Sequence, residues 1–348
     1  MALQPDDIDD LTNLTLKKYA RKKWVDISYT RQRNFFVERF MGKKTTPSEG
    51  GIEQTWKVQV NATGNARFTG LYGVDSTSVR NLTIEASQKW AASTNNFIYD
   101  VNESLFQSEL ETIVEQLLVR EHDMMMGWYD LMETALWTSP LSSTQDPRPI
   151  SGIPFWLQKN ATEGFNGGDP SGFAAGAANI LTSSYANWKN YTFSFSKISR
   201  DDLIAKWIKA VEWCQFRPAH SFQQLDASNS QWVFYTTWNV LEPLFQFNDS
   251  RNDNLKDLSG IPTAVFRGVP VDWVPALSNT SDAAYDSQNP LYGIDWSCFE
   301  FFFLKGKELN RYPAQQVPNQ HTVRIVHADS IGNMKCKNRR RSFVGYLA

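Results

Sequence analysis

The strongest hydrophobic periodicity in the chain lies between residues 103 and 137. Apolar side chains recur there at spacings of three and four residues, at Leu105, Phe106, Leu110, Ile113, Val114, Leu117, Leu118, Met124, Met125, Trp128, Leu131, Met132, Ala135 and Leu136. This spacing predicts one amphipathic helix of about 33 residues, roughly 50 Å long. Asn102 is suited to cap its start, Ser104 with Gln107 offers an alternative capping box, and Ser139-Pro140 ends it.

A different pattern precedes this helix, between Ile52 and about Trp90. Two short alternating runs, TWKVQV and VRNLTIEA, flank the segment NATGNARFTG, whose glycines and asparagines suit tight turns. Alternation of apolar and polar residues is typical of a strand with one covered face. We therefore predict two antiparallel strands, a long hairpin with no core of its own.

The second half of the chain mixes one further helix with strands. DDLIAKWIKAVEWCQF, at 201–216, begins with two acids that suit a helix N-terminus. The runs that follow predict strands and loops, and they are WVFYTTW, VFRGVPVDWVPAL, FEFFFLKG, HTVRIVHAD and the closing MKCKNRRRSFVGYLA. The glycine-rich stretch at 163–180 lacks GxxxxGK[ST] and GxGxxG, so we expect a flexible loop rather than a phosphate site. The class is α+β.

Composition and charge narrow the function classes. A chain of 348 residues is long enough for one large or two moderate domains, and a net charge of −2 with a pI near 6.1 argues against a wholly basic surface for nucleic acid. No apolar run approaches the roughly 18 to 20 residues that span a bilayer, and CFEFFFL at 298–304 is interrupted by Glu300. The N-terminus has no secretory or transit pattern, so we expect the protein to stay in the cytoplasm that makes it.

Candidate chemistry is sparse. The four histidines have no metal-ligand spacing, there is no GxSxG, and Cys214, Cys298 and Cys336 are best interpreted as buried thiols. The sequence therefore predicts no catalytic residues, no cofactor and no metal. The 13 tryptophans, with Asp272 beside Trp273 and Asp295 beside Trp296, leave open a carbohydrate-active enzyme or lectin. Polar chains rich in aromatics are equally typical of proteins whose surfaces bind each other.

The order of these parts resembles the HK97-fold major capsid proteins of tailed bacteriophages. Three segments carry the resemblance in addition to the hairpin and long helix. They are VFRGVPVDWVPAL, in which Gly268–Val271 matches a Gly-x-Pro-Val turn of that family, NPLYGIDW at 289–296, and CKNRRRSFVGYLA at 336–348. The resemblance covers nearly the whole chain and implies an α+β capsid fold with an N-terminal arm, an extended hairpin called the E-loop, a spine helix, and peripheral and axial domains.

The resemblance also implies a division of the chain. Residues 1–45 correspond to the N-terminal arm and 46–95 to the E-loop. Residues 96–198 correspond to the first part of the peripheral domain, with the spine helix at 103–137. Residues 199–311 correspond to the axial domain, and 312–348 to the final peripheral strands.

A major capsid protein of this family self-assembles into pentamers and hexamers that form an icosahedral head around double-stranded DNA. The resemblance thus implies a non-enzymatic virion protein, assembled in the host cytoplasm, with no membrane and no sequence-specific DNA contact. Portal, scaffolding and decoration proteins are the further partners it implies. A shell of the encapsulin type, which encloses cargo enzymes, shares the fold and is the nearest alternative. The family's covalent Lys-to-Asn crosslink cannot be assigned to residues of this chain.

Six residues are candidates for contacts between subunits. Trp56, Arg67, Phe68 and Tyr72 lie in the predicted hairpin, which we expect to be ordered by packing over a neighbouring subunit. Arg339 and Arg341 would share one face of a final extended strand. A solvated charge run and contact with packaged phosphates are both open for these arginines. We favour pairing with carboxylates of an adjacent subunit, because bidentate pairing fixes register.

Overall fold

The structure is a computed structural model, and it describes residues 33–41, 50–60, 65–73, 81–105, 110–216, 231–249 and 265–348. Residues 1–32 and 42–45 of the predicted arm lie outside these ranges. In the part that is described, no helix is long and apolar enough to cross a membrane.

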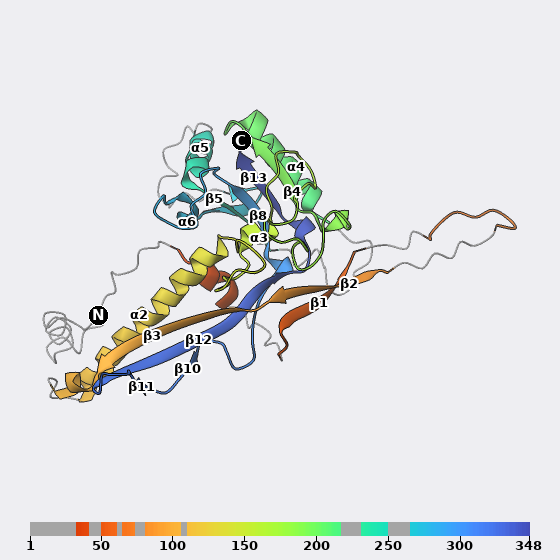
Figure 1. The fold of residues 1–348 in the computed structure, drawn as a ribbon. Helices are drawn as coiled ribbons and strands as arrows, with labels where there is room; N and C mark the ends of the chain where they lie inside the picture. Colours follow the sequence, from red (N-terminus) through yellow and green to blue (C-terminus); the bar gives the residue numbers. More distant parts are fainter. Residues whose placement is uncertain are drawn as a thin grey trace.

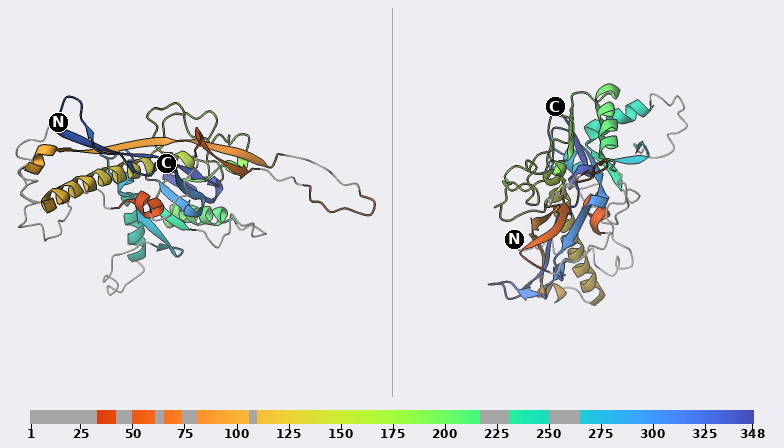
Figure 2. Two further views of the ribbon diagram at one scale, coloured as in Figure 1. Left: turned by 90° about the horizontal axis from the view of Figure 1, so that it is seen from below. Right: turned by 90° about the vertical axis from the view of Figure 1, so that its right-hand side faces the viewer.

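The longest strands and the longest helix form an elongated layer, which we call the plate (Figure 1). Strand β3 (Ala91–Asp100) pairs antiparallel with β12 (Val323–Cys336), and β12 continues against β9 (Phe299–Phe303). Two short strands, β10 (Asn310–Arg311) and β11 (Gln315–Gln316), pair with β12 on its other side. Helix α2 (Leu110–Leu136) runs beside β3 (Figure 2, left).

Helix α2 confirms the predicted long helix, but Asn102 does not cap it, and Gln107 of the alternative capping box lies outside the described residues. Its 27 residues end at Leu136, and Trp128 on its apolar face is buried. Asn102 lies instead in a 3-10 turn, η2 (Val101–Leu105), where its backbone N–H donates to Asp100 Oδ1 at 2.9 Å. The side chain of Asp100 thus organises the turn that leads towards the helix.

A six-stranded sheet forms the second body of the molecule. Its order is β4-β13-β8-β5-β7-β6, with the bounds β4 (Tyr191–Phe195), β13 (Phe343–Leu347), β8 (Leu291–Asp295), β5 (Trp232–Thr236), β7 (Val269–Trp273) and β6 (Val265–Phe266). Strand β13 runs parallel to β4 and antiparallel to β8. The predicted second helix is confirmed as α4 (Ala205–Cys214), preceded by a π-helical turn, η4 (Arg200–Ile204), whose cap is Ser199.

The longest helix that was not predicted lies in this second body. The run WNVLEPLFQFND, expected to be strand and loop, forms α5 (Trp238–Asp249) with Pro243 inside it. Proline in a helical run argues against a helix, because it removes a backbone donor. The remaining helical segments are short: α3 (Ile153–Trp156), α6 (Pro275–Ser278), η1 (Val37–Met41), η3 (Ala186–Trp188), η7 (Trp296–Cys298) and η8 (Arg339–Arg341).

Two hydrophobic clusters stabilise the fold. The larger cluster joins the plate to one face of the six-stranded sheet, and the smaller fills the space between the other face and α4. Adjacent residues of β13 serve both clusters, since Val344 lies in the first and Phe343 in the second. The three cysteines are buried free thiols, as predicted.

The glycine-rich stretch at 163–180 is packed rather than a loose loop. Phe173, Ala177 and Ile180 are buried in the larger cluster, and Ala177 O accepts a hydrogen bond from Trp188 Nε1 at 3.2 Å. Asp169 accepts hydrogen bonds from the backbone N–H and the hydroxyl of Thr182. The stretch is therefore a loop, as predicted, but apolar residues between the glycines anchor it to the core.

Candidate assembly surfaces

The predicted hairpin consists of β1 (Glu53–Gln59) and β2 (Thr83–Lys89), paired antiparallel from Glu53↔Lys89 to Gln59↔Thr83. Its root packs on its own chain, where Val58, Val60 and Ala86 join the larger cluster. Ser87 N donates to Ala178 O at 3.1 Å. The prediction of a hairpin with no core of its own is therefore correct only for the outer part of the hairpin.

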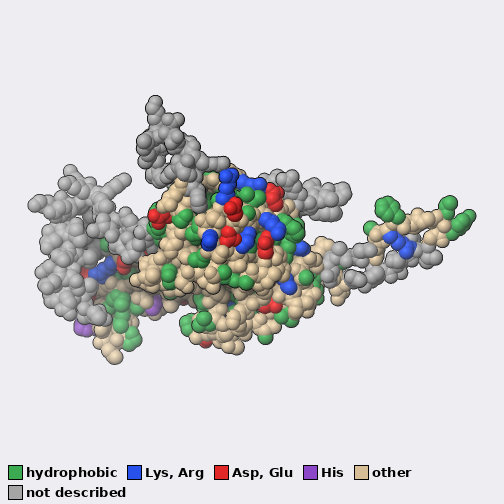
Figure 3. Space-filling view, turned by 90° about the horizontal axis from the view of Figure 1, so that it is seen from above, with side chains coloured by type: hydrophobic (Ala, Val, Ile, Leu, Met, Phe, Trp, Pro, Cys, Tyr) green, Lys and Arg blue, Asp and Glu red, His purple; other side chains and the backbone are tan. Residues whose placement is uncertain are grey.

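The tip of the hairpin reaches far from the body (Figures 1 and 3). Phe68, Leu71 and Tyr72 have relative exposures of 107%, 95% and 100%, and Arg67 beside them is also exposed. Exposed apolar residues that cluster on one element mark interaction sites more often than isolated ones do. Leu71 extends the set of apolar residues predicted here.

Trp56 lies at the root and has a contact inside its own chain. Its ring centroid is 6.4 Å from that of Trp156, and the side chain is half-buried against the larger cluster. Its indole nitrogen is buried without a hydrogen-bond acceptor among the described residues. The structure therefore separates Trp56 from the tip residues with which it was grouped.

The three consecutive arginines do not form the extended strand that their position predicts. Residues Arg339–Arg341 form the 3-10 turn η8, in which the side chain of Asn338 accepts from Arg340 N at 3.0 Å. A 3-10 helix has about three residues per turn, so the three side chains point in three directions instead of alternating between the two faces of a strand. It lies between β12 and β13, where the chain passes from the plate to the six-stranded sheet.

Arg339 is completely buried, at 0% exposure. This burial contradicts the prediction that Arg339 contacts another subunit. Its Nε donates to Trp156 O at 2.6 Å, and one Nη donates to Gly168 O at 2.9 Å and Asn190 Oδ1 at 3.2 Å. Burial lowers the pKa of this guanidinium to about 10. The glycine-rich stretch thus binds a cation of its own chain through a backbone carbonyl.

Arg341 is also buried, and its carboxylate partner belongs to its own chain. Arg341 and Asp295 form an ion pair of 2.7 Å, and Asp295 Oδ1 accepts from Ser297 Oγ at 2.7 Å and Gln231 N at 3.1 Å. Arg341 pairs with a carboxylate, as predicted. The carboxylate belongs to the same chain, however, and not to an adjacent subunit. The sequence signal that could have found Asp295 is its place in NPLYGIDW, a buried strand with one acid.

Arg340 is the arginine of the three that reaches the surface. Its guanidinium carbon lies 4.3 Å from the ring centroid of Phe165 and 5.2 Å from that of Phe216, and one Nη donates to Asn187 Oδ1 at 2.6 Å. These cation–π contacts hold the glycine-rich stretch, the end of α4 and η8 together.

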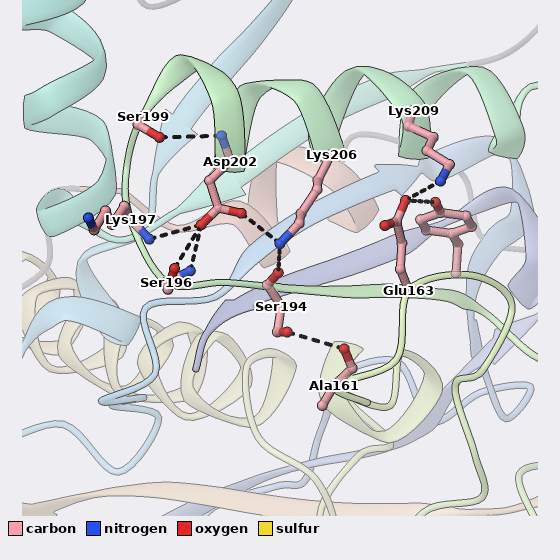
Figure 4. A network of polar contacts seen from close by, with 10 residues as sticks. Ala161, Glu163, Ser194, Ser196, Lys197, Ser199, Asp202, Lys206 and Lys209 are labelled. Carbon is pink, nitrogen blue, oxygen red and sulfur yellow. Dashed lines mark hydrogen bonds and ion pairs between the residues drawn. The ribbon is translucent and has the colours of Figure 1, made fainter.

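Charged residues of both signs gather over the outer side of α4 (Figure 3). Asp202 accepts from the backbone N–H groups of Ser196 and Lys197 and pairs with Lys206 at 2.6 Å (Figure 4). Partial burial opposes its ionisation, but these donors together hold the pKa of Asp202 well below its usual range. Glu163 pairs with Lys209 at 2.7 Å, which likewise lowers the pKa of Glu163.

The two carboxylates that suggested carbohydrate chemistry have structural partners. Asp272 accepts from Arg33 Nη1 at 2.8 Å, and Asp295 is the buried partner of Arg341. Glycoside hydrolysis requires two carboxyl groups that flank one open site. A fully buried Asp295 does not meet that requirement.

A plate with a long helix, a projecting hairpin and a separate six-stranded sheet together define the HK97-type capsid fold. A chain of the "Cyanophage A-1(L) capsid asymmetric unit" matches with a TM-score of 0.63 and 13% identity, over 96% of this chain and 98% of that one. The "Capsid of native GTA particle" gives a TM-score of 0.56 and 9% identity, over 94% of each chain. "Gordonia phage Cozz" gives 0.53 and 12%, over 94% of this chain and 89% of that one.

No family model matches the sequence, and no curated protein matches it either. At these identities the structural likenesses establish the fold. They extend over nearly the whole length of both chains, so the likeness concerns the whole fold rather than a shared fragment.

Proposed function

We propose that this chain is a major capsid protein that self-assembles into pentamers and hexamers and closes an icosahedral head around double-stranded DNA. The observation that carries the proposal is the likeness to capsid chains over 96% of this chain, combined with a projecting hairpin whose tip is apolar and fully exposed. A shell subunit needs such surfaces, because many modest interfaces per copy supply the free energy of assembly.

The hairpin tip is the proposed contact with a neighbouring copy. Phe68 and Tyr72 would bury aromatic surface there, and Arg67 would supply a polar rim. Trp56 would support the contact from the root, where it steadies the hairpin against the body. Arg339 and Arg341 have no role between subunits, because both are buried.

The division of the chain is proposed with the same boundaries: arm 1–45, E-loop 46–95, peripheral domain 96–198 and 312–348, and axial domain 199–311. Within the arm, residues 33–41 pack into the core of the subunit.

The partners of this protein would be further copies of itself, a portal, scaffolding and decoration proteins, and packaged DNA held without sequence-specific contacts. Its location would be the virion, after assembly in the host cytoplasm.

Electron microscopy of the purified, expressed protein tests this function. Closed shells, capsomers or tubes are the expected result, with sedimentation far faster than a 39.8 kDa monomer. A persistent monomer that hydrolyses or binds glycans would contradict the proposal. Native particles that enclose an enzyme instead of DNA would favour the encapsulin-type shell.

A further inference from the structure

Aromatic side chains gather around Arg340 at the C-terminal end of α4. Trp213 belongs to α4, Phe216 follows it, and Phe165 lies in the glycine-rich stretch. The ring centroid of Phe165 is 6.3 Å from that of Trp213 and 5.9 Å from that of Phe216. We call these three rings, together with Arg340, the aromatic patch.

The aromatic patch is open to solvent. Trp213 is 56% exposed, and Phe165, Phe216 and Arg340 are each partly exposed. Single exposed apolar residues are ordinary, but several that adjoin one another mark sites where another segment binds. The patch therefore offers aromatic surface for a second segment to cover.

Arg340 gives the aromatic patch a positive charge. Its guanidinium carbon lies over the rings of Phe165 and Phe216, and one Nη donates to the neutral side chain of Asn187 at 2.6 Å. No carboxylate among the residues that the structure describes forms an ion pair with Arg340. A guanidinium held in this way is preorganised to bind a carboxylate.

The neighbouring charges are balanced within the chain. Glu163 pairs with Lys209 at 2.7 Å (Figure 4), and Glu212, next to Trp213, pairs with Arg267. These pairs leave the charge of Arg340 uncompensated at the surface. The occupant that complements the patch is thus an apolar side chain with carboxylates beside it.

One stretch outside the described residues has this chemistry. In DDIDDL, at 6–11, Ile8 lies between two pairs of aspartates, and we call these residues the acidic segment. The longer internal stretches outside the described residues, 42–49, 74–80, 217–230 and 250–264, contain at least as many Lys and Arg as Asp and Glu. Charge complementarity therefore favours the acidic segment.

The acidic segment is within reach of the patch on its own chain. Arg33 Nη1 lies 2.8 Å from Asp272 Oδ1 of β7, and Tyr191 of β4 contacts Trp213 of the patch. In the order β4-β13-β8-β5-β7, four strand spacings separate β7 from β4, which is roughly 20 Å. A stretch as long as residues 12–32 can span up to about 70 Å. A tether of this length also raises the local concentration of the segment.

We propose that the acidic segment docks on the aromatic patch of its own chain. Ile8 covers Trp213, and an aspartate of the segment pairs with Arg340. The contact buries the exposed rings and balances the charge of the guanidinium. It forms within one subunit and does not depend on the proposed function.

Competition with a peptide tests this contact in the full-length chain. The probe is a fluorescent peptide of residues 1–14, and its anisotropy is measured with dilute chains that sediment as monomers. Two chains are compared, the wild type and a chain with Asp6, Asp7, Asp9 and Asp10 all changed to Asn, called the Asn chain. The Asn chain should bind the peptide at least about tenfold more tightly, because its own segment no longer competes for the patch.

Substitutions in the Asn chain locate the binding site. Trp213→Ser and Arg340→Gln should each weaken peptide binding by at least about fivefold. The matched controls are Trp238→Ser and Arg311→Gln, which change an exposed tryptophan on α5 and an exposed arginine on β10, and they should leave the affinity unchanged. A peptide with Ile8→Ser should also bind more weakly, because it lacks the apolar side chain.

Equal affinity of the peptide for the wild type and the Asn chain, or no detectable binding to either, would overturn the proposal. Binding that survives Trp213→Ser, or that the Ile8→Ser peptide reproduces, would overturn it too, since charge alone would then explain the attraction. Thermal melting of each variant checks that it is folded. If Arg340→Gln melts early, Trp213→Ser still decides, because it removes a ring that is mostly exposed.

Discussion

Arg341 and Asp295 form an ion pair of 2.7 Å in which the two side chains are only 3% and 0% exposed. Removing one member of such a pair leaves an uncompensated charge in the interior. Arg341→Met should therefore lower the free energy of unfolding by about 3–5 kcal/mol. Denaturant titration of the purified variant measures this loss.

The control is the double variant Arg341→Met with Asp295→Asn, which removes both charges and should lose less stability than the single variant. A single variant that loses under about 1 kcal/mol would behave like an exposed pair and would contradict the burial of this one. Alanine at both Arg339 and Arg341 should prevent or strongly weaken folding, because both guanidinium groups are buried.

Gly345 and Phe193 lie on paired strands, and their closeness makes a second prediction. A Cβ at Gly345 would lie 2.3 Å from Cζ of Phe193, so alanine forces the ring to move. Overpacking of this kind costs about 1–3 kcal/mol. Gly345→Ala should lower the melting temperature, and Phe193→Leu in the same chain should restore part of the loss. Gly70→Ala at the hairpin tip, where no atom lies within 4 Å, is the control.

The low pKa of Asp202 makes stability depend on pH. A carboxyl group whose pKa is depressed in the folded state contributes stability above its unfolded value, near 4, and loses it as pH falls towards the folded value. Asp202→Asn should therefore reduce stability at pH 7, and the difference from the wild type should shrink steadily below about pH 4. Melting temperatures from pH 7 to pH 2 measure this.

Local patterns were sufficient to predict the parts of the fold that depend on neighbouring residues. The spacing of three and four residues that predicts α2 is a property of the helix itself, and the alternation in β1 and β2 is a property of the strands. Strand β13 follows from its apolar run in the same way. These elements were correct because tertiary contacts agree with their local preferences.

The arginine run could not be predicted, because three identical residues have three different environments. Arg341 depends on Asp295, Arg339 on carbonyl groups of Trp156 and Gly168, and Arg340 on rings at Phe165 and Phe216. Each partner is distant in sequence, and no local pattern encodes the pairing. The burial of Phe36 and Phe40 had a weak signal in NFFVERF, where these two residues are one helical turn apart.

The exposed hairpin tip carries the last prediction. Phe68, Leu71 and Tyr72 contribute nothing to the packing of their own chain, since each is at least 95% exposed. Replacing all three by serine should therefore leave the melting temperature of an unassembled subunit unchanged. The same change should lower the yield of shells, because the proposed contact with a neighbouring copy loses its apolar surface.

Light scattering and electron microscopy measure the shell yield of this variant. The matched control replaces Ile52, Leu141 and Leu181 by serine, since these are exposed apolar residues of the same chain away from the tip. Normal shell assembly by the tip variant would exclude the tip as a contact between subunits. A fall in melting temperature would show instead that the tip packs on its own body. Selective loss of assembly, with stability retained, is the combination that a contact made only between subunits requires.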